Sequence, residues 1–268
     1  MELPLWPGKP PLWDDAHATG ANANACTMQP YLLPESDGTR PAFVCLAGGG
    51  YAGRSLHEAH DIARWMNDLG LHAFVCNYRV IPCRWPAALL DAQRAMRVVR
   101  HRASEWRVDA ERVGVIGFSA GGHLGATLST KWDRPVEGAA DEVDALDARP
   151  SLTVLGYSVV SFLHEYHGGS MRALLGDDHT TEMRELLSAE RHVRPACPPA
   201  FIWTTADDHV VPASNTLKYF SALRAAGIPA EMHVFESGPH GLGLAPQHPE
   251  CRAWPGLCAA WLARHGWR

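Results

Sequence analysis

The sequence predicts an α/β fold in which a mostly parallel sheet carries helices on both faces, built as a single domain over residues 1–268. Short, uniformly apolar runs recur along the chain, and stretches with helical spacing separate them. Such apolar strands are typical of parallel sheets, because both faces of those sheets are covered. With 268 residues and 46% hydrophobic composition, the chain can bury one large core, and we expect no second domain.

The N-terminal part of the chain predicts an irregular arm followed by two strands. Residues 1–26 carry Pro, Gly, Asn and Ala without periodicity, so we expect the irregular arm there. A short strand is expected over residues 27–33. Residues 43–47 form an apolar run that ends in three glycines, which indicates a buried strand followed by a loop that approaches another group closely. We call residues 47–51 the glycine loop.

Helical and strand patterns then alternate. Residues 56–69 have apolar side chains at helical spacing and stop at Gly70, a common helix terminator. Pro86 opens an amphipathic helix over residues 86–103 at a position where proline is well tolerated. Further strands are expected at residues 71–78, 112–118, 151–157, 200–205 and 230–235. Further helices are expected at residues 120–130, 214–226 and 254–264.

The regular alternation is interrupted over residues 161–197. This segment contains Gly168-Gly169, Asp177-Asp178 and two short helical stretches, around residues 171–175 and 181–189. We expect it to be a small insertion over the active-site edge of the sheet.

Composition and charge argue against several classes of function. The formal net charge is −5 and the basic residues are scattered, so we expect no nucleic-acid partner. The N-terminus lacks the features of a secretory signal and no later stretch is long enough to span a membrane, so we expect a cytoplasmic protein without a membrane partner. Seven cysteines without a C-x-x-C pair are expected to be reduced, buried thiols.

The serine elbow, residues 117–121, has the sequence Gly-Phe-Ser-Ala-Gly with Ser119 at its centre. It lies between an expected strand and an expected helix. A serine on such a turn needs a strained backbone to lift its hydroxyl clear of the sheet, and Gly117 and Gly121 leave room for that backbone. A glycine-rich turn can also be a plain connection or a phosphate loop, so the pentapeptide alone leaves these alternatives open.

A catalytic serine also requires a base and a carboxylate that orients the base. Asp208 follows the expected strand 200–205, and His240 follows the expected strand 230–235. Ser, Asp and His in this order, each on a loop after a strand, is the order of the α/β-hydrolase triad. We therefore predict Ser119 as nucleophile, Asp208 as orienting acid and His240 as base.

Neighbouring residues offer alternatives to parts of this assignment. Spacing to the following Val-Pro pair favours Asp208 over Asp207, which we expect to cap or hydrogen-bond the turn. His57 and His60 resemble a metal-binding helix, but their spacing is i, i+3 and not the i, i+4 of zinc proteases. We predict no catalytic metal, and the reaction of a serine triad needs no cofactor.

The tetrahedral intermediate of acyl transfer carries an oxyanion that backbone N–H groups must meet. The glycine loop follows an early buried strand and is placed to supply such groups, and the N–H of Ala120 would complete the oxyanion hole. The alternative is a flexible loop that merely links strand to helix.

Together these segments resemble α/β-hydrolase esterases of the acetyl-esterase and carbohydrate-esterase type, including acetylxylan-esterase-like and feruloyl-esterase-like proteins. The resemblance runs from about Phe43 to the C-terminus. It rests on the glycine loop, the serine elbow and three further segments: residues 77–82, residues 208–212 and residues 238–241.

The resemblance implies the triad named above, with Gly49, Gly50 and Ala120 donating to the oxyanion. Arg79 and Pro82 match family positions with a structural role, anchoring the loop after their strand. One departure is Ala47, which stands where related esterases usually have a histidine that organises the glycine loop.

The implied reaction is hydrolysis of a small-molecule or oligosaccharide ester through an acyl-enzyme, with short acyl groups such as acetyl preferred on the resemblance. The alternatives are another acyl hydrolase of this fold, such as an aryl-formamidase or a peptidase-like enzyme, and a catalytically silent binding protein. The sequence leaves the oligomeric state undetermined. The candidates for the pocket wall are Tyr51, Trp85, His123, Tyr157, Phe162 and His209.

Overall fold

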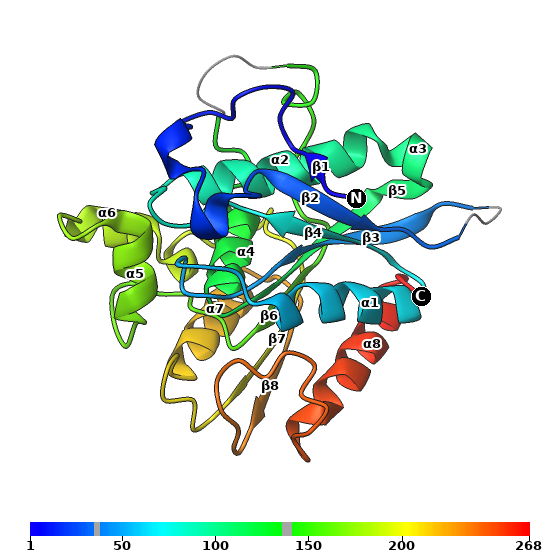
Figure 1. Cartoon of the computed structure of the whole chain (residues 1–268). Helices are drawn as coiled ribbons and strands as arrows, with labels where there is room; N and C mark the ends of the chain where they lie inside the picture. The colour runs from blue at the N-terminus through cyan, green and yellow to red at the C-terminus, as the bar shows by residue number, and fades with distance from the viewer. Residues whose placement is uncertain (35–37, 136–140) are drawn as a thin grey trace.

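A computed structural model describes residues 1–34, 38–135 and 141–268. Its centre is an eight-stranded sheet with the order β1-β2-β4-β3-β5-β6-β7-β8 (Figure 1). Strands β1 and β2 are antiparallel to their neighbours, and the pairings from β4 to β8 are parallel. The strands are β1 Leu3–Pro4, β2 Thr27–Tyr31, β3 Arg40–Leu46, β4 His72–Asn77, β5 Val108–Phe118, β6 Thr153–Gly156, β7 Ala200–Thr205 and β8 Ala230–Phe235.

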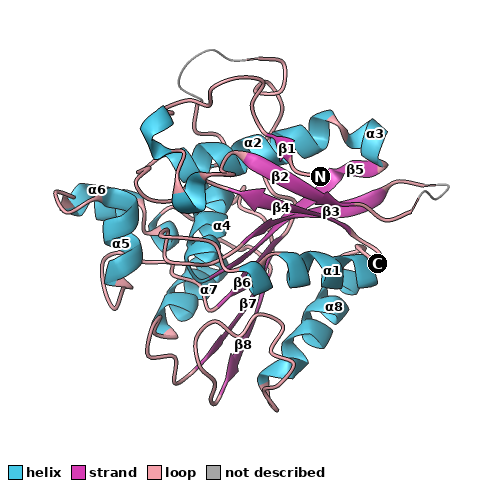
Figure 2. Ribbon diagram, in the orientation of Figure 1, coloured by secondary structure: helices cyan, strands magenta, loops and turns pink. Residues whose placement is uncertain are grey.

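Helices cover both faces of the sheet (Figure 2). The apolar side chains of α1 and α8 pack into one core cluster, and those of α2, α4 and α7 pack into the cluster on the opposite face. The expected α/β architecture, with the fold of the α/β hydrolases, is confirmed. The helices are α1 His60–Asp68, α2 Ala87–His101, α3 Ala103–Trp106, α4 Ser119–Lys131, α5 Gly168–Leu175, α6 Thr181–Leu186, α7 Ser214–Ala225 and α8 Trp254–Arg264.

The N-terminal arm is more ordered than its composition predicts. The prediction of an irregular segment over residues 1–26 is wrong for β1, which pairs with β2, and Leu5 and Trp6 beyond it are buried. Asn22 donates to the carbonyl of Val80 at 2.9 Å and accepts from the Val80 amide at 3.0 Å. A two-residue strand has too little periodicity to be recognised in a sequence, and its place depends on contacts with residues far along the chain.

The helix expected over residues 56–69 is interrupted. A 3-10 turn covers Leu56–Glu58, Ala59 has φ −112° and ψ −77°, and α1 begins at His60. The break turns Glu58 into the interior, where it is buried. Apolar spacing does not reveal this break, because the spacing on both sides of it still fits one helix.

The loop after β4 is anchored by a buried ion pair. Arg79 donates through Nε and Nη2 to the two carboxylate oxygens of Asp91 on α2, at 2.9 and 2.8 Å. The Arg79 amide donates to the same carboxylate at 2.9 Å, and Nη1 donates to the Pro11 carbonyl at 2.5 Å. Both side chains of the ion pair are fully buried, so one guanidinium holds the loop, α2 and the N-terminal arm together.

All seven cysteines are free and buried. Six of them belong to the core clusters on the two faces of the sheet, Cys26 of the N-terminal arm included, and Cys83 lies in the loop after β4. No helix in the described ranges is both long enough and apolar enough to cross a membrane. The segment between β6 and β7 holds α5 and α6, which lie beside one end of the sheet in Figure 1.

Candidate active site

Five strand ends place the predicted site residues at one edge of the sheet. In the parallel register Leu46 pairs with Gly117, Phe118 with Gly156, and Gly156 with Trp203. The residues that follow β3, β5, β6, β7 and β8 therefore emerge together. This carboxyl edge is where open α/β sheets bind their ligands.

The serine elbow has the strained turn that its glycines predict. Ser119 has φ +52°, in the left-handed region that costs a residue with a Cβ about 1–3 kcal/mol. The close packing that permits this turn needs Gly121, because a Cβ there would lie 2.1 Å from the Leu46 carbonyl oxygen. This turn places Ser119 at the junction between the end of β5 and the start of α4.

Ser119, His240 and Asp208 form an unbroken hydrogen-bonded chain. Ser119 Oγ lies 2.8 Å from His240 Nε2, and His240 Nδ1 lies 2.7 Å from Asp208 Oδ2. Asp208 has only acceptors when it is ionised, so Nδ1 donates to it, and Nε2 is left to accept from the Ser119 hydroxyl. This arrangement can take the proton of the serine as it attacks.

Two further hydrogen bonds hold the Asp208 carboxylate. The amides of Val210 and Val211 donate to Oδ1 at 2.8 and 2.9 Å. Burial raises the pKa of Asp208, but the hydrogen bonds from His240 and from the two amides outweigh it, so the pKa lies below its ordinary value. The carboxylate therefore stays ionised beside His240 at neutral pH.

Asp207 holds the loop that carries His240. Its Oδ1 accepts from the Gly238 amide at 2.8 Å, and Thr205 Oγ1 donates to the Gly238 carbonyl at 2.7 Å. The expectation that Asp207 bonds the turn of its own loop is wrong, because its recorded hydrogen bond goes to the loop after β8.

The glycine loop curls beside the serine elbow. Gly49 has φ +130° and Gly50 has φ +65°, and a Cβ on Gly49 would lie 2.3 Å from the Gly53 carbonyl oxygen. Within the described residues, no acceptor is recorded for the amides of Gly49 and Gly50. The Ala120 amide lies in the first turn of α4, where helical amides have no partner in the helix. These three amides therefore remain candidates to donate to an oxyanion formed at Ser119.

Glu58 is a site residue that sequence reasoning missed. Its Oε2 accepts from the Gly48 amide at 2.7 Å, and its Oε1 accepts from the Tyr157 hydroxyl at 2.6 Å. A Cβ on Gly48 would lie 2.4 Å from Glu58 Oε2 and 2.9 Å from Ser119 Cβ, so only glycine fits. Glu58 therefore anchors the glycine loop. Ala47, which stands where related esterases usually have a histidine for this purpose, has no polar side chain to do so.

Tyr157 connects Glu58 to the histidine of the triad. Its hydroxyl accepts from the Gly243 amide at 2.9 Å, and its ring meets the His240 ring edge-on, with centroids 4.9 Å apart. One buried network thus fixes the glycine loop and the loop after β8. The only sequence signal for Glu58 was its position within the 57–60 pattern, which suggested a metal instead.

Four of the six pocket candidates do not line a surface. Tyr51, His123, Tyr157 and Phe162 are at most 2% exposed, so the prediction that they form the pocket wall is wrong. Aromatic and histidine side chains on loops near a nucleophile fit equally well in the core that supports the site, and sequence position does not separate the two.

His123 is the centre of this supporting layer. Its Nε2 donates to the Leu187 carbonyl at 2.8 Å, so its Nδ1 accepts from the Tyr51 hydroxyl at 2.7 Å. Phe162 stacks on the ring with centroids 4.4 Å apart. Burial lowers the pKa of His123 to about 4, which keeps the ring neutral. The chain of bonds ties the glycine loop to α4 and to the segment after α6.

The other two pocket candidates are accessible. Trp85 is half-buried, with the Arg134 guanidinium 5.2 Å from its ring centroid and its amide donating to the Leu174 carbonyl at 2.9 Å. His209 is exposed beside Asp208. These two remain candidates for contact with a substrate.

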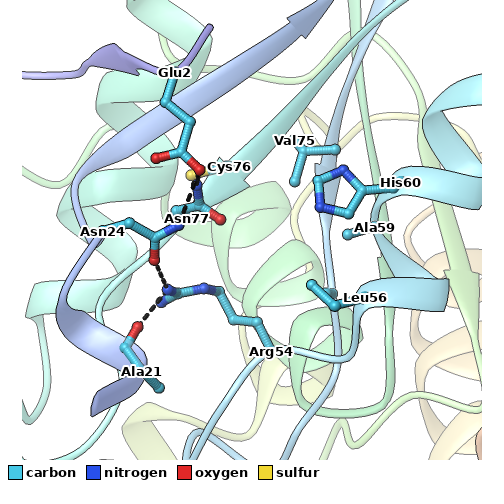
Figure 3. Close-up of a pocket in the computed structure, with 11 residues that line it drawn as sticks. Glu2, Ala21, Asn24, Arg54, Leu56, Ala59, His60, Val75, Cys76 and Asn77 are labelled. Carbon is cyan, nitrogen blue, oxygen red and sulfur yellow. Dashed lines mark hydrogen bonds between the residues drawn. The ribbon is translucent and has the colours of Figure 1, made fainter.

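A cavity of about 160 Å³ lies between the glycine loop and the N-terminal arm (Figure 3). Arg54 crosses it, donating to the Tyr78 carbonyl at 2.6 Å, to Asn24 Oδ1 at 2.7 Å and to the Ala21 carbonyl. None of the triad residues lines this cavity. The cavity therefore lies apart from the nucleophile. The hydrogen bonds of Arg54 hold the N-terminal arm against the segment that follows the glycine loop.

His57 and His60 have separate partners. His57 Nε2 lies 2.9 Å from the Gly241 carbonyl oxygen, and His60 Nδ1 lies 2.6 Å from the Tyr31 hydroxyl. In the three described stretches of chain, no three potential ligands gather in a way that could hold a metal ion.

Relatives of this chain are known. Acetylxylan esterase of Xylanibacter ruminicola is 33% identical over 219 residues, which are 80% of this chain and 43% of that protein. Endo-1,4-beta-xylanase B of Butyrivibrio fibrisolvens is 34% identical over 218 residues, 80% of this chain and 34% of that protein. The chain thus spans less than half the length of either relative.

A solved structure matches the whole chain. The acetyl ester-xyloside bifunctional hydrolase from Caldicellulosiruptor lactoaceticus is 39% identical, with a TM-score of 0.94 over 100% of this chain and 97% of that one. Residues 28–223, most of the chain, match the BD-FAE family. With the α/β-hydrolase fold and the strand-end residues described above, these matches show that the chain belongs to the BD-FAE family.

Proposed function

We propose that this chain is a serine carboxylic-ester hydrolase that removes acetyl groups from xylan-type carbohydrates. The observation that carries the proposal is the hydrogen-bonded chain from Ser119 through His240 to Asp208. The acetyl and xylan parts are supported by the two relatives and the solved structure, which are named as an acetylxylan esterase, a xylanase and an acetyl ester-xyloside hydrolase.

The first half-reaction forms an acyl-enzyme. Ser119 Oγ attacks the ester carbonyl carbon while His240 Nε2 accepts the serine proton, and the Asp208 carboxylate stabilises the resulting imidazolium. The amides of Gly49, Gly50 and Ala120 donate to the oxyanion of the tetrahedral intermediate. As the intermediate collapses, the bond to the alcohol oxygen breaks and the alcohol leaves with the proton from His240.

The second half-reaction releases the acid. A water molecule gives its proton to His240 and attacks the acyl carbon on Ser119, through the same oxyanion site. Collapse of this second intermediate returns the proton to Ser119 and frees acetate. Apart from the ester and this water molecule, only side chains and backbone amides of this chain take part in these steps, so we propose no cofactor.

The test compares the wild type with Ser119→Ala on p-nitrophenyl acetate, butyrate and octanoate and on acetylated xylo-oligosaccharides. We expect turnover concentrated on the acetyl esters, and a loss of at least about 10⁴-fold in kcat for the variant. Equal thermal unfolding temperatures of the two proteins would show that the fold is unchanged.

Other outcomes would assign the chain elsewhere. Turnover confined to formamide or peptide substrates, and lost with Ser119, would indicate the aryl-formamidase or peptidase-like alternative. A protein that hydrolyses no ester and is not labelled at Ser119 by a fluorophosphonate would be a catalytically silent binding protein.

A further inference from the structure

His167 is a polar side chain beside the candidate active site that none of the steps above uses. It lies between β6 and β7, directly before α5, and is half-buried. A Cβ added to Gly50 would lie 3.9 Å from His167 Cε1 and 3.9 Å from Ser170 Oγ, so the histidine ring faces the glycine loop at van der Waals range. The segment after β6 therefore reaches the loop that offers donors to the oxyanion.

The hydrogen bonds of His167 determine which ring nitrogen carries the proton. The Ser170 amide donates to His167 Nδ1 at 3.1 Å, and Ser170 Oγ lies 2.7 Å from the same nitrogen. A backbone N–H can only donate, so Nδ1 is an acceptor and the neutral ring carries its proton on Nε2. Over the described parts of the chain, no hydrogen-bond partner is recorded for Nε2.

The surroundings keep the His167 ring neutral. Burial lowers the pKa of His167, and the nearby His240 and Arg172 side chains lower it further, against a smaller opposing effect of Asp208. The N-terminus of α5, whose amide the ring caps, also disfavours a cation. A neutral N–H donor at a fixed position suits an uncharged acceptor such as a hydroxyl oxygen.

We propose that His167 is a substrate-binding residue whose Nε2–H donates a hydrogen bond to a hydroxyl group on the sugar side of the acetyl ester. This inference rests on the proposed function and names one contact that would select the alcohol. The sugar side is favoured because an acetyl group carries no hydroxyl, so a hydroxyl acceptor on the substrate belongs to the alcohol part of the ester.

The test uses two variants, one that keeps the helix-capping ability of His167 and one that keeps its flat ring. His167→Asn keeps a side chain that is favoured at a helix N-cap but removes the imidazole. His167→Phe keeps a flat ring but has neither nitrogen. We expect both to lower kcat/KM for acetylated xylo-oligosaccharides about 3- to 10-fold, as for loss of one neutral hydrogen bond, while kcat/KM for p-nitrophenyl acetate changes less than about twofold.

Thr180→Ala is the matched control. Thr180 is exposed and caps α6 in the same segment, with its side chain accepting from the Met183 amide. We expect this variant to leave kcat/KM unchanged on both esters, because it weakens the segment without touching the His167 ring. Thermal unfolding of all three variants would detect any general loss of structure.

The outcomes separate this inference from the proposed function. An equal loss on both esters, no loss on the sugar ester, or a wild-type value for His167→Phe would overturn the inference alone. If the wild type turns over no acetylated xylo-oligosaccharide while Ser119-dependent hydrolysis of p-nitrophenyl acetate persists, the sugar part of the proposed function and this inference are both wrong.

Discussion

Glu58 fastens the glycine loop and the loop of the triad histidine through its two carboxylate oxygens. Glu58→Gln keeps the size of the side chain but replaces one acceptor with an NH₂ donor, which would face either the Gly48 amide or the Tyr157 hydroxyl. Since two of the three proposed oxyanion donors follow Gly48, we expect kcat on p-nitrophenyl acetate to fall about 10- to 100-fold, with KM changed less than about threefold. Steady-state kinetics would measure both constants.

The matched control for this variant is Glu236→Gln, at an exposed glutamate just beyond β8. It should retain wild-type kcat, because its carboxylate is open to solvent. A Glu58→Gln enzyme with wild-type kcat would show that the glycine loop keeps its shape without the Glu58 carboxylate.

His123 makes stability depend on pH. Its pKa is lowered to about 4 from an ordinary value of 6.5, so between these values the unfolded chain binds a proton that the folded protein does not. Stability from this group is present above pH 6.5 and is lost as the pH falls toward 4. We expect the unfolding free energy to drop by about 2 kcal/mol from this residue between pH 7 and pH 5, measured by urea denaturation.

His123→Gln provides the comparison, because glutamine can accept from Tyr51 and donate to the Leu187 carbonyl but does not titrate in this range. The variant should be less stable at pH 7, and its stability should change less between pH 7 and pH 5. The same pH slope in both proteins would mean that other groups cause the dependence.

At the scale of elements, helix α4 packs directly against the backbone at the end of β3, because Gly121 has no side chain. A Cβ on Gly121 would lie 2.1 Å from the Leu46 carbonyl oxygen and 2.4 Å from that of Ala47, and backbone cannot move aside without displacing the glycine loop. Gly121→Ala should therefore lower the unfolding free energy by about 2–3 kcal/mol, measured by thermal or urea unfolding.

Gly125→Ala, one turn later on α4, is the control. The nearest atom to its added Cβ is Leu155 Cδ2 at 3.3 Å, a side-chain atom that can shift. Alanine has the higher helix propensity, by about 1 kcal/mol, so this variant should be as stable as the wild type or more so. Equal losses in the two variants would show that glycine is needed throughout the helix and not at the contact with β3.

The order of elements is predictable from the sequence because short apolar runs, which form the buried strands, alternate with longer stretches that fit helices. Expected and observed bounds of β7, β8 and α8 coincide, at residues 200–205, 230–235 and 254–264. The prediction of an element fails where contacts with distant residues, and not the local sequence pattern, determine its structure. Strand β1 forms because it can pair with β2, far along the chain. Helix α1 begins only at His60, because the turn before it directs Glu58 into the interior, where its carboxylate accepts from the Gly48 amide.

The residues of the candidate site likewise fall into those that the sequence predicts and those that it does not. Ser119, Asp208 and His240 could be found because each follows a strand, and the sheet brings strand ends together whatever the loops do. Glu58 and the proposed role of His167 could not be found, because their partners depend on how the loops close over the edge of the sheet. The burial of Tyr51, His123, Tyr157 and Phe162 depends on the same closure, which no local spacing expresses.

At the scale of the whole molecule, the N-terminal arm is part of the body. Arg79 reaches the Pro11 carbonyl, Asn22 bonds to Val80, and Arg54 bonds to Asn24. These contacts join the arm to the loop after β4 and to the segment after the glycine loop. Strand β1 of the arm pairs with Thr27 and Met28 at the start of β2 and so covers this part of the sheet's edge.

The reactivity of the seven buried thiols measures how far the folded protein opens. Burial raises the pKa of every one of them, to about 12 for Cys45 and about 11 for Cys251, so little reactive thiolate forms at neutral pH. We expect almost no reaction with Ellman's reagent in buffer, and seven equivalents in denaturant.

Mass spectrometry after brief labelling in moderate urea would count the modified cysteines on each molecule. Because the thiols lie on both faces of the sheet and in the arm, cooperative unfolding should yield molecules with none or all seven modified. Cys26 lies in the arm, and Asn22 and His17 of the arm contact the Cys83 thiol at 3.8 and 3.7 Å. Molecules modified only at these two cysteines would therefore show that the arm detaches before the sheet opens, and the labelling pattern would identify which parts of the chain open independently.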